Sequence, residues 1–147
     1  MKKIPKLLLV LIILTLCFIW GNSLLSANLS GTVSGWVKDF INTIIGELGG
    51  TSMSGDGVLR KIAHASEFAL LGIELTFLLL GRFKKHISLL FLCGLSVALL
   101  DETIQLFVNG RAGSVKDIWI DFAGYCVGAT MFLLLKRVTR HKKETPK

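Results

Sequence analysis

Residues 100–124 read LDETIQLFVNGRAGSVKDIWIDFAG and connect two strongly apolar runs of the chain. The stretch places seven polar or charged side chains where the two runs meet, namely Asp101, Glu102, Gln105, Arg111, Lys116, Asp117 and Asp121. If both runs cross a membrane, these side chains lie together at one membrane surface. An ionisable residue costs about 2.5–3.5 kcal/mol at the centre of a transmembrane helix and less near its ends, and such residues usually serve a function. We therefore interpret this group as a candidate functional site.

Four apolar blocks make up most of the 147-residue chain, and they cover residues 7–25, 62–81, 87–108 and 118–135. At a rise of about 1.5 Å per residue, a helix over each block is long enough to cross a hydrocarbon core of roughly 30 Å. The length of the chain suits one domain. The sequence therefore predicts a single all-α membrane domain over residues 1–147 with four transmembrane helices.

The positive charges indicate the orientation of these helices. The net charge is +7, but the Lys and Arg residues form short clusters beside the apolar blocks, without the basic stripe of a nucleic-acid-binding surface. Twelve of the 17 fall at the N-terminus, in the second connection and in the C-terminal tail: Lys2, Lys3, Lys6, Arg82, Lys84, Lys85, Lys136, Arg137, Arg140, Lys142, Lys143 and Lys147. By the positive-inside rule, both termini are cytoplasmic and no nucleic-acid partner is expected.

The first apolar block has two interpretations, a cleaved signal peptide or a retained helix. Its apolar run is long, and Leu25 is a poor residue three places before a cut after Ala27. We therefore expect the helix to be retained. Cys17, Cys93 and Cys126 all fall in apolar blocks, where they are most simply small hydrophobic side chains.

The long first connection, residues 22–59, contains a second helical pattern. Over residues 33–48, apolar side chains recur every three or four positions and polar ones fill the opposite side. The pattern predicts an external amphipathic helix in the membrane interface, with Trp36 at headgroup depth. A helix that caps the bundle without touching lipid is the alternative.

The second span carries its own polar residues. Lys61, His64 and Glu67 are spaced three apart and share one side of the helix, with Glu74 two turns deeper. In the predicted topology, this polar edge reaches the same outer membrane face as residues 100–124. We expect nine residues to line a ligand-binding site there: Lys61, His64, Glu67, Asp101, Glu102, Gln105, Arg111, Asp117 and Asp121.

Several of these residues also have purely structural interpretations. Asp117 would favourably place negative charge in the first turn of the fourth span. Arg111 could pair with Asp101 or Glu102 and only fasten the loop, and His64 could be a polar anchor. Asn109-Gly110 predicts a turn, and Gly124 and Gly128 form a G-x-x-x-G pattern that permits close helix packing.

The motifs of this edge resemble those of the VanZ-like family. They are K-x-x-H-x-x-E-F at residues 61–68, D-E-x-x-Q at 101–105, R-x-x-S-x-x-D at 111–117 and D-x-x-G at 121–124. Many members carry Tyr in place of Phe68 and Asn in place of Asp121. The resemblance implies a bacterial cell membrane and a link to resistance against the glycopeptide teicoplanin, while the family's biochemical activity is unsettled.

Four functions are compatible with this pattern. The first is binding of a lipid headgroup or lipid-tailed glycopeptide, with Lys61 and Arg111 contacting phosphate. The second is an enzyme acting on a lipid-linked envelope precursor, with His64, Glu67, Asp101 and Glu102 as candidate acid–base groups. The others are a structural accessory protein and a transporter with Glu74 as a proton relay. A divalent metal held by His64 and several carboxylates is chemically sensible, because hard oxygen ligands suit Mg²⁺ or Mn²⁺. No established metal-ligand spacing is present, however, so neither a metal site nor a cofactor is predicted.

Overall fold

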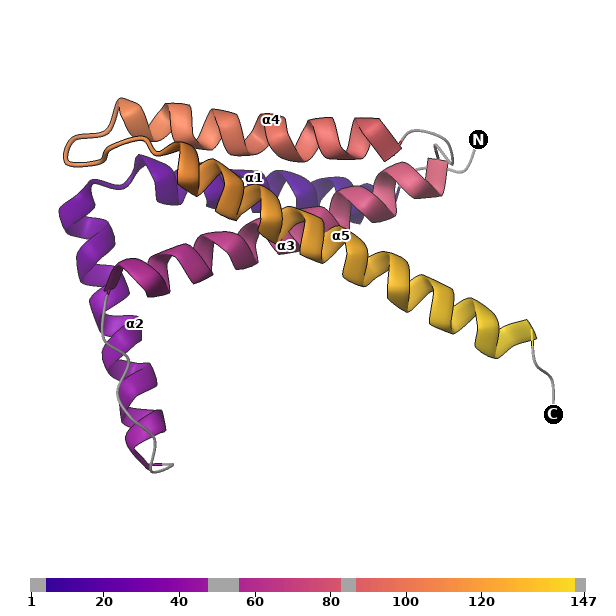
Figure 1. Cartoon of the computed structure of the whole chain (residues 1–147), viewed down its shortest axis with the longest axis horizontal. Coiled ribbons are helices and arrows are strands. Elements are labelled where there is room, and N and C mark those ends of the chain that lie inside the picture. Colours follow the sequence, from indigo (N-terminus) through magenta and orange to yellow (C-terminus); the bar gives the residue numbers. More distant parts are fainter. Residues whose placement is uncertain (1–4, 48–55, 83–86, 145–147) are drawn as a thin grey trace.

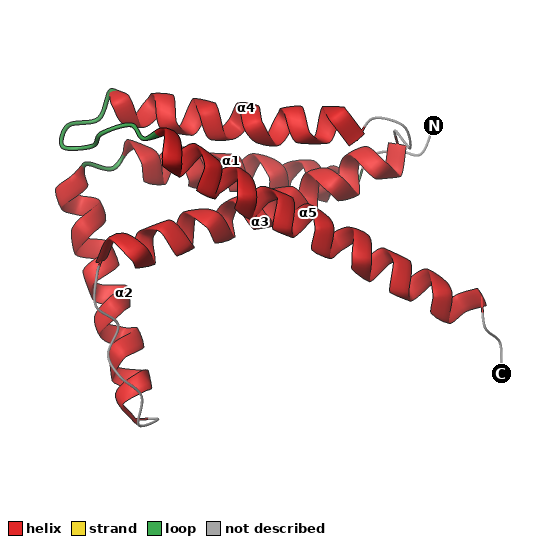
Figure 2. Ribbon diagram, viewed as in Figure 1, coloured by secondary structure: helices red, strands yellow, loops and turns green. Residues whose placement is uncertain are grey.

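The computed structural model describes residues 5–47, 56–82 and 87–144. These residues form five helices and contain no strand, as Figure 2 shows: α1 (Lys6–Leu24), α2 (Ala27–Glu47), α3 (Asp56–Arg82), α4 (Ile87–Leu106) and α5 (Val115–Glu144). Helices α1, α3, α4 and α5 are long and apolar enough to cross a membrane. The predicted all-α fold, with four spans and an additional helix after the first, is confirmed.

Several helix boundaries differ from the prediction. Helix α2 begins at Ala27, six residues before the predicted start at 33, and α3 begins at Asp56 rather than 62. Helix α5 continues to Glu144, because the basic tail contains good helix formers and no Gly or Pro before that residue. Asn22 and Ser23 lie in the last turn of α1, within the predicted first span of residues 7–25, although the first connection was also counted from residue 22. Both side chains reach the site.

The four spans form a bundle with two distinct ends (Figure 1). At one end, α1 finishes, α3 begins, and the connection 107–114 joins α4 to α5, so segments far apart in sequence meet there. We call this the α2 end, because α2 runs across it at a steep angle to the spans (Figure 1). Two exposed aromatic residues of α2, Trp36 and Phe40, belong to its predicted apolar stripe.

The exterior of the spans is apolar. Large hydrophobic side chains such as Leu14, Phe18, Leu92, Val127 and Leu135 are more than half exposed. Soluble monomers rarely expose a contiguous apolar surface of this extent. This surface is the one expected of helices that face lipid.

The tightest packing in the bundle joins α3 to α5, which cross each other in Figure 1. A Cβ atom on Gly124 would meet the backbone of Ala65, and one on Gly128 would meet the backbone of Ala69. Small residues at such a crossing let two helix backbones approach closely. The predicted packing role of the G-x-x-x-G pattern is therefore confirmed.

Tyr125 connects this crossing to α4. Its ring is fully buried against Gly94, and its hydroxyl group donates a hydrogen bond to the carbonyl oxygen of Leu90 at 2.9 Å. A buried hydroxyl group needs such a partner, which explains why a polar aromatic residue fits an apolar interface.

The substitution Tyr125→Phe should destabilise the bundle modestly. It keeps the ring and removes one buried hydrogen bond, whose net contribution is about 0.5–1.5 kcal/mol. The midpoint of unfolding in mixed micelles of a mild detergent and SDS measures this change. Thr103→Val is the control, because that exposed hydroxyl group binds only the Leu99 carbonyl of its own helix. Equal midpoints for Tyr125→Phe and wild type would contradict the role of this hydrogen bond.

Candidate functional site

The nine predicted site residues all lie at the α2 end. Lys61, His64 and Glu67 are in the first half of α3, and Asp101, Glu102 and Gln105 are in the last two turns of α4. Arg111 lies in the 107–114 connection, and Asp117 and Asp121 are in the first two turns of α5. Three spans and one connection therefore supply the site. Its function remains a prediction, but the spatial convergence is a property of the fold.

Asp101 is the most completely enclosed of these residues, with a fully buried side chain. Its Oδ1 accepts a hydrogen bond from the Ser23 hydroxyl group at 2.7 Å, and its Oδ2 accepts one from the Gln105 amide at 2.9 Å. The Gln105 amide also lies 3.3 Å from the Ser23 hydroxyl oxygen. These neutral donors fix the orientation of the carboxylate between α1 and α4. Lone pairs remain on both oxygens for a further partner.

Glu67 connects α3 to α1 in a similar way. Its Oε1 accepts a hydrogen bond from the Asn22 amide at 2.8 Å, while its Oε2 lies 4.0 Å from Nδ1 of His64. The predicted shared face of His64 and Glu67 is confirmed. Seven residues deeper, Glu74 accepts a hydrogen bond from the Thr15 hydroxyl group of α1 at 3.1 Å. The same face of α3 therefore contacts α1 through two carboxyl groups, the part-buried Glu67 and the buried Glu74, and Glu74 lies away from the α2 end.

Arg111 does not pair with Asp101 or Glu102, so that structural interpretation is wrong about its partners. Its Nε and Nη2 donate hydrogen bonds to the carbonyl oxygens of Leu25 and Asn22, at 2.9 and 3.0 Å. These carbonyls belong to the end of α1, where the regular helical hydrogen bonds stop, and the Asn22 carbonyl also accepts the Leu25 N–H at 3.3 Å. Burial lowers the pKa of the Arg111 guanidinium, and the nearby positive charge of Arg60 lowers it further. The group still remains protonated at neutral pH.

Two acidic residues fasten the start of α5. The backbone N–H of Ser114 donates a hydrogen bond to the Glu102 carboxylate, and Asp117 forms an ion pair with Lys61 at 2.7 Å. The Lys61 side chain is 45% exposed, so this pair contributes little to stability. Asp117 also adds negative charge at the N-terminus of α5, as predicted. These contacts connect α5 to α4 and α3.

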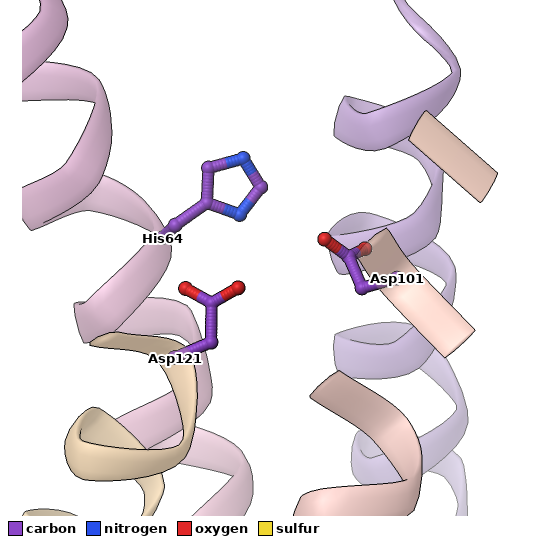
Figure 3. A group of neighbouring side chains, drawn as sticks. All are labelled: His64, Asp101 and Asp121. Atoms are coloured by element: carbon purple, nitrogen blue, oxygen red, sulfur yellow. The ribbon is translucent and has the colours of Figure 1, made fainter. Parts of the chain in front are cut away.

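Figure 3 shows His64, Asp101 and Asp121 around one small space. One ligand atom from each residue lies within 4.8 Å of the others, although the three residues come from α3, α4 and α5. Asp121 is 3% exposed. The sequence predicted that these residues share the site, but their close approach depends on the packing of three helices.

Two cavities lie near this group, and His64 lines one of them. That cavity opens at the α2 end and has a volume of about 410 Å³, and its polar side is lined by His64, Glu67, Asn22, Arg60 and Arg111. Its apolar side is formed by Phe18, Val37, Leu59, Ile62 and Ala63. A second cavity of about 480 Å³ lies deeper between α1 and α3, lined by Leu14, Thr15, Phe18, Ser66, Glu67 and Leu70. The two cavities share Phe18 and Glu67. We call them the headgroup cavity and the deep cavity.

Sequence reasoning missed Asn22, Ser23 and Arg60. The first two belong to the last turn of α1, where the predicted first span (7–25) and first connection (22–59) overlapped. Arg60 borders the headgroup cavity beside Arg111, yet in the sequence it is one of two adjacent basic residues, Arg60 and Lys61. The polar pair Asn22-Ser23 at the end of an apolar run could have indicated that α1 contributes to the site. Nothing in the sequence indicated that Arg60, and not only Lys61, borders the cavity.

Comparison with known proteins identifies a family. A sequence profile of the VanZ/LLP1 family matches residues 7–136, which include every residue of the site and parts of all four spans. Searches of curated proteins and of solved structures gave no match. Because the profile covers nearly the whole chain, the resemblance to the VanZ-like family is confirmed, and the protein belongs to the VanZ/LLP1 family.

Proposed function

We propose that this protein binds the anionic headgroup of a lipid or lipid-tailed molecule at the α2 end of its bundle. One observation supports the proposal: a cavity with a charged wall lies beside a mainly apolar cavity, and Phe18 and Glu67 line both. An amphipathic occupant has the same two parts, a polar headgroup and an apolar tail. The deep cavity faces the lipid-exposed exterior between α1 and α3, where an acyl chain would enter.

The charges of the headgroup cavity favour an anion. Arg60 and Arg111 border the same space, and their like charges repel each other. Among the residues that the structure describes, Arg60 has no acidic partner, while Arg111 is held only by backbone carbonyl groups. A phosphate group between the two guanidinium groups would relieve this repulsion through charge-assisted hydrogen bonds.

Helix α2 supports a site at the membrane surface. Its Val37 lines the headgroup cavity, while Trp36 and Phe40 are 76% and 68% exposed. An amphipathic helix with exposed aromatic residues is typical of the membrane interface, where it lies parallel to the surface. Together with the distribution of positive charge, this helix supports the outer face as the location of the site.

Arg60→Gln should remove most of the preference for anionic lipid. The experiment compares phosphatidylglycerol with zwitterionic phosphatidylcholine on the purified protein, by native mass spectrometry. A bidentate charged contact contributes about 1.5–3 kcal/mol, so we expect roughly a tenfold or greater loss of the preference. Lys116→Gln is the control, because Lys116 is exposed at the same end and does not line either cavity. Equal binding of both lipids by the wild type, or an equal effect of both variants, would contradict the proposal.

An enzyme acting on a lipid-linked envelope precursor is the second candidate, and the position of His64 favours it. His64 lines the headgroup cavity, and its Nδ1 has no hydrogen-bond partner among the described residues. Asp101 and Glu102 do not line that cavity, since they bind Ser23, Gln105 and Ser114 instead. Of the four acid–base candidates, His64 and Glu67 are therefore the two that line the headgroup cavity. Incubation of the purified protein with such a precursor, followed by product analysis, distinguishes catalysis from binding alone.

A further inference from the structure

His64, Asp101 and Asp121 bring one imidazole and two carboxylate groups to a single point in the bundle (Figure 3). The three side chains come from three different spans and point toward the same space. Their nearest ligand atoms lie within 4.8 Å of one another. Bonds to a transition metal are about 2.0–2.2 Å long, so ligand atoms on opposite sides of an ion lie about 4.0–4.4 Å apart. Small side-chain movements would therefore close this group around an ion.

Asp121 provides an independent indication of a ligand. Its side chain is 3% exposed, and within the described ranges it has no hydrogen-bond or ion-pair partner. Buried carboxyl groups are normally hydrogen-bonded or paired, because otherwise nothing offsets the free energy lost when the group is removed from water. The carboxylate points into the space between His64 and Asp101 (Figure 3). A partner in that space would account for its burial.

The local charge balance calls for a cation. Asp101 and Asp121 are buried side by side, and among the residues that the structure describes neither forms an ion pair. Lys61 is paired with Asp117, and Arg111, whose charge interacts with Asp101, donates its hydrogen bonds to backbone carbonyl oxygens. Two like charges in one buried site repel each other strongly. One divalent cation would offset both.

A small cavity lies beside this group, lined by two of its three residues and not by Asp101. This cavity of about 20 Å³ touches His64, Gln105 and Asp121, and its remaining walls are Lys61, Asp117 and Ile120. A volume of this size holds about one water-sized particle. It is too small for a lipid headgroup, so it is distinct from the headgroup cavity. His64 lines both spaces.

We propose that His64, Asp101 and Asp121 form a binding site for one divalent transition-metal ion, Mn²⁺ or Zn²⁺. Imidazole suits zinc, and carboxylate groups suit manganese, so a mixed set favours ions of this class over Ca²⁺. Ser23 and Gln105 hold the Asp101 carboxylate in place, as outer partners do for ligands in known metal sites. The ion would lie beside the headgroup cavity, but the proposal does not depend on lipid binding.

Metal retention by the full-length protein tests this site. The protein is purified in detergent, treated with a chelator and dialysed against Mn²⁺ or Zn²⁺, and bound metal is measured by mass spectrometry of the elements. We expect one ion per chain for wild type. Loss of an outer partner already weakens metal binding about 10–100-fold, so Asp121→Asn should weaken it more than about 100-fold. Asp39→Asn, an exposed carboxylate change on α2, should leave retention unchanged.

Two further measurements separate the metal site from a folding effect. Ser23→Ala keeps all three ligands and removes one outer hydrogen bond, so it should weaken binding about 10–100-fold. The electron paramagnetic resonance signal of bound Mn²⁺ should show a nitrogen coupling that His64→Ala removes. Failure of wild type to retain either ion would overturn the proposal. Retention by Asp121→Asn equal to that of wild type would overturn it as well.

Discussion

Gly128→Val should unfold the bundle far more readily than any change on the lipid-facing exterior. A side chain at this position would meet the backbone of Ala69 in α3, and backbone atoms cannot move aside as a flexible side chain can. Overpacking a tight interface costs about 1–3 kcal/mol and occasionally more, and we expect the upper end of that range. Helices α3 and α5 would have to separate, which would also displace the start of α5 from the site.

The midpoint of unfolding in mixed micelles of a mild detergent and SDS measures this effect. Gly21→Val in α1 is the matched control, since a Cβ there meets nothing within 4 Å. It introduces the same side chain into another span and should shift the midpoint little. If both valine variants unfold at the same SDS fraction, the close α3–α5 crossing does not hold the bundle together.

If this protein protects cells against teicoplanin, His64→Ala or Asp101→Asn should abolish that protection. His64 borders the headgroup cavity. Asp101 accepts hydrogen bonds from Ser23 at the end of α1 and from Gln105 at the end of α4. The first variant removes a cavity wall, and the second changes the charge and hydrogen bonding of a fully buried group. Both should return the inhibitory concentration to that of cells without the protein. The expected drop in inhibitory concentration therefore equals the whole increase that the wild-type protein gives.

The measurement requires matched amounts of folded protein in the membrane of a susceptible bacterium. Glu74→Gln is a suitable comparison, because Glu74 contacts Thr15 and lies away from the α2 end. If the protein binds its ligand at the α2 end, Glu74→Gln should protect nearly as well as wild type. If His64→Ala and Asp101→Asn protect equally well, the polar group only supports the bundle. Loss of protection in Glu74→Gln alone would instead favour a proton-relay transporter.

Hydropathy and charge were sufficient to predict the main architecture. The four apolar blocks became α1, α3, α4 and α5, and the three-residue spacing of His64 and Glu67 placed both on one face of α3. The spans and the shared helix face depend only on the spacing of nearby residues, so one sequence is enough to predict them. The G-x-x-x-G pattern of Gly124 and Gly128 also predicted a close crossing, although not its partner helix.

The contacts of the site were less predictable, because they depend on how helices rotate and where they end. Glu102 follows Asp101 directly, and the structure separates their partners: Asp101 binds Ser23 and Gln105, while Glu102 binds the backbone of Ser114. Ser23 escaped prediction because α1 continues beyond its most apolar part. The approach of Asp121 to His64 requires the α3–α5 crossing, which no spacing within either helix reveals.

Photocrosslinking of the membrane-embedded protein tests whether a lipid-like molecule lies in the headgroup and deep cavities. The probe is an anionic phospholipid that carries a diazirine in its acyl chain near the headgroup, and the labelled peptides are then mapped. Binding in the cavities predicts labelling concentrated on residues 14–18 of α1 and 59–70 of α3, reduced by excess unlabelled anionic lipid. Labelling spread evenly over exposed positions such as Leu92 and Leu99 of α4, with no effect of the competitor, would contradict binding in the cavities.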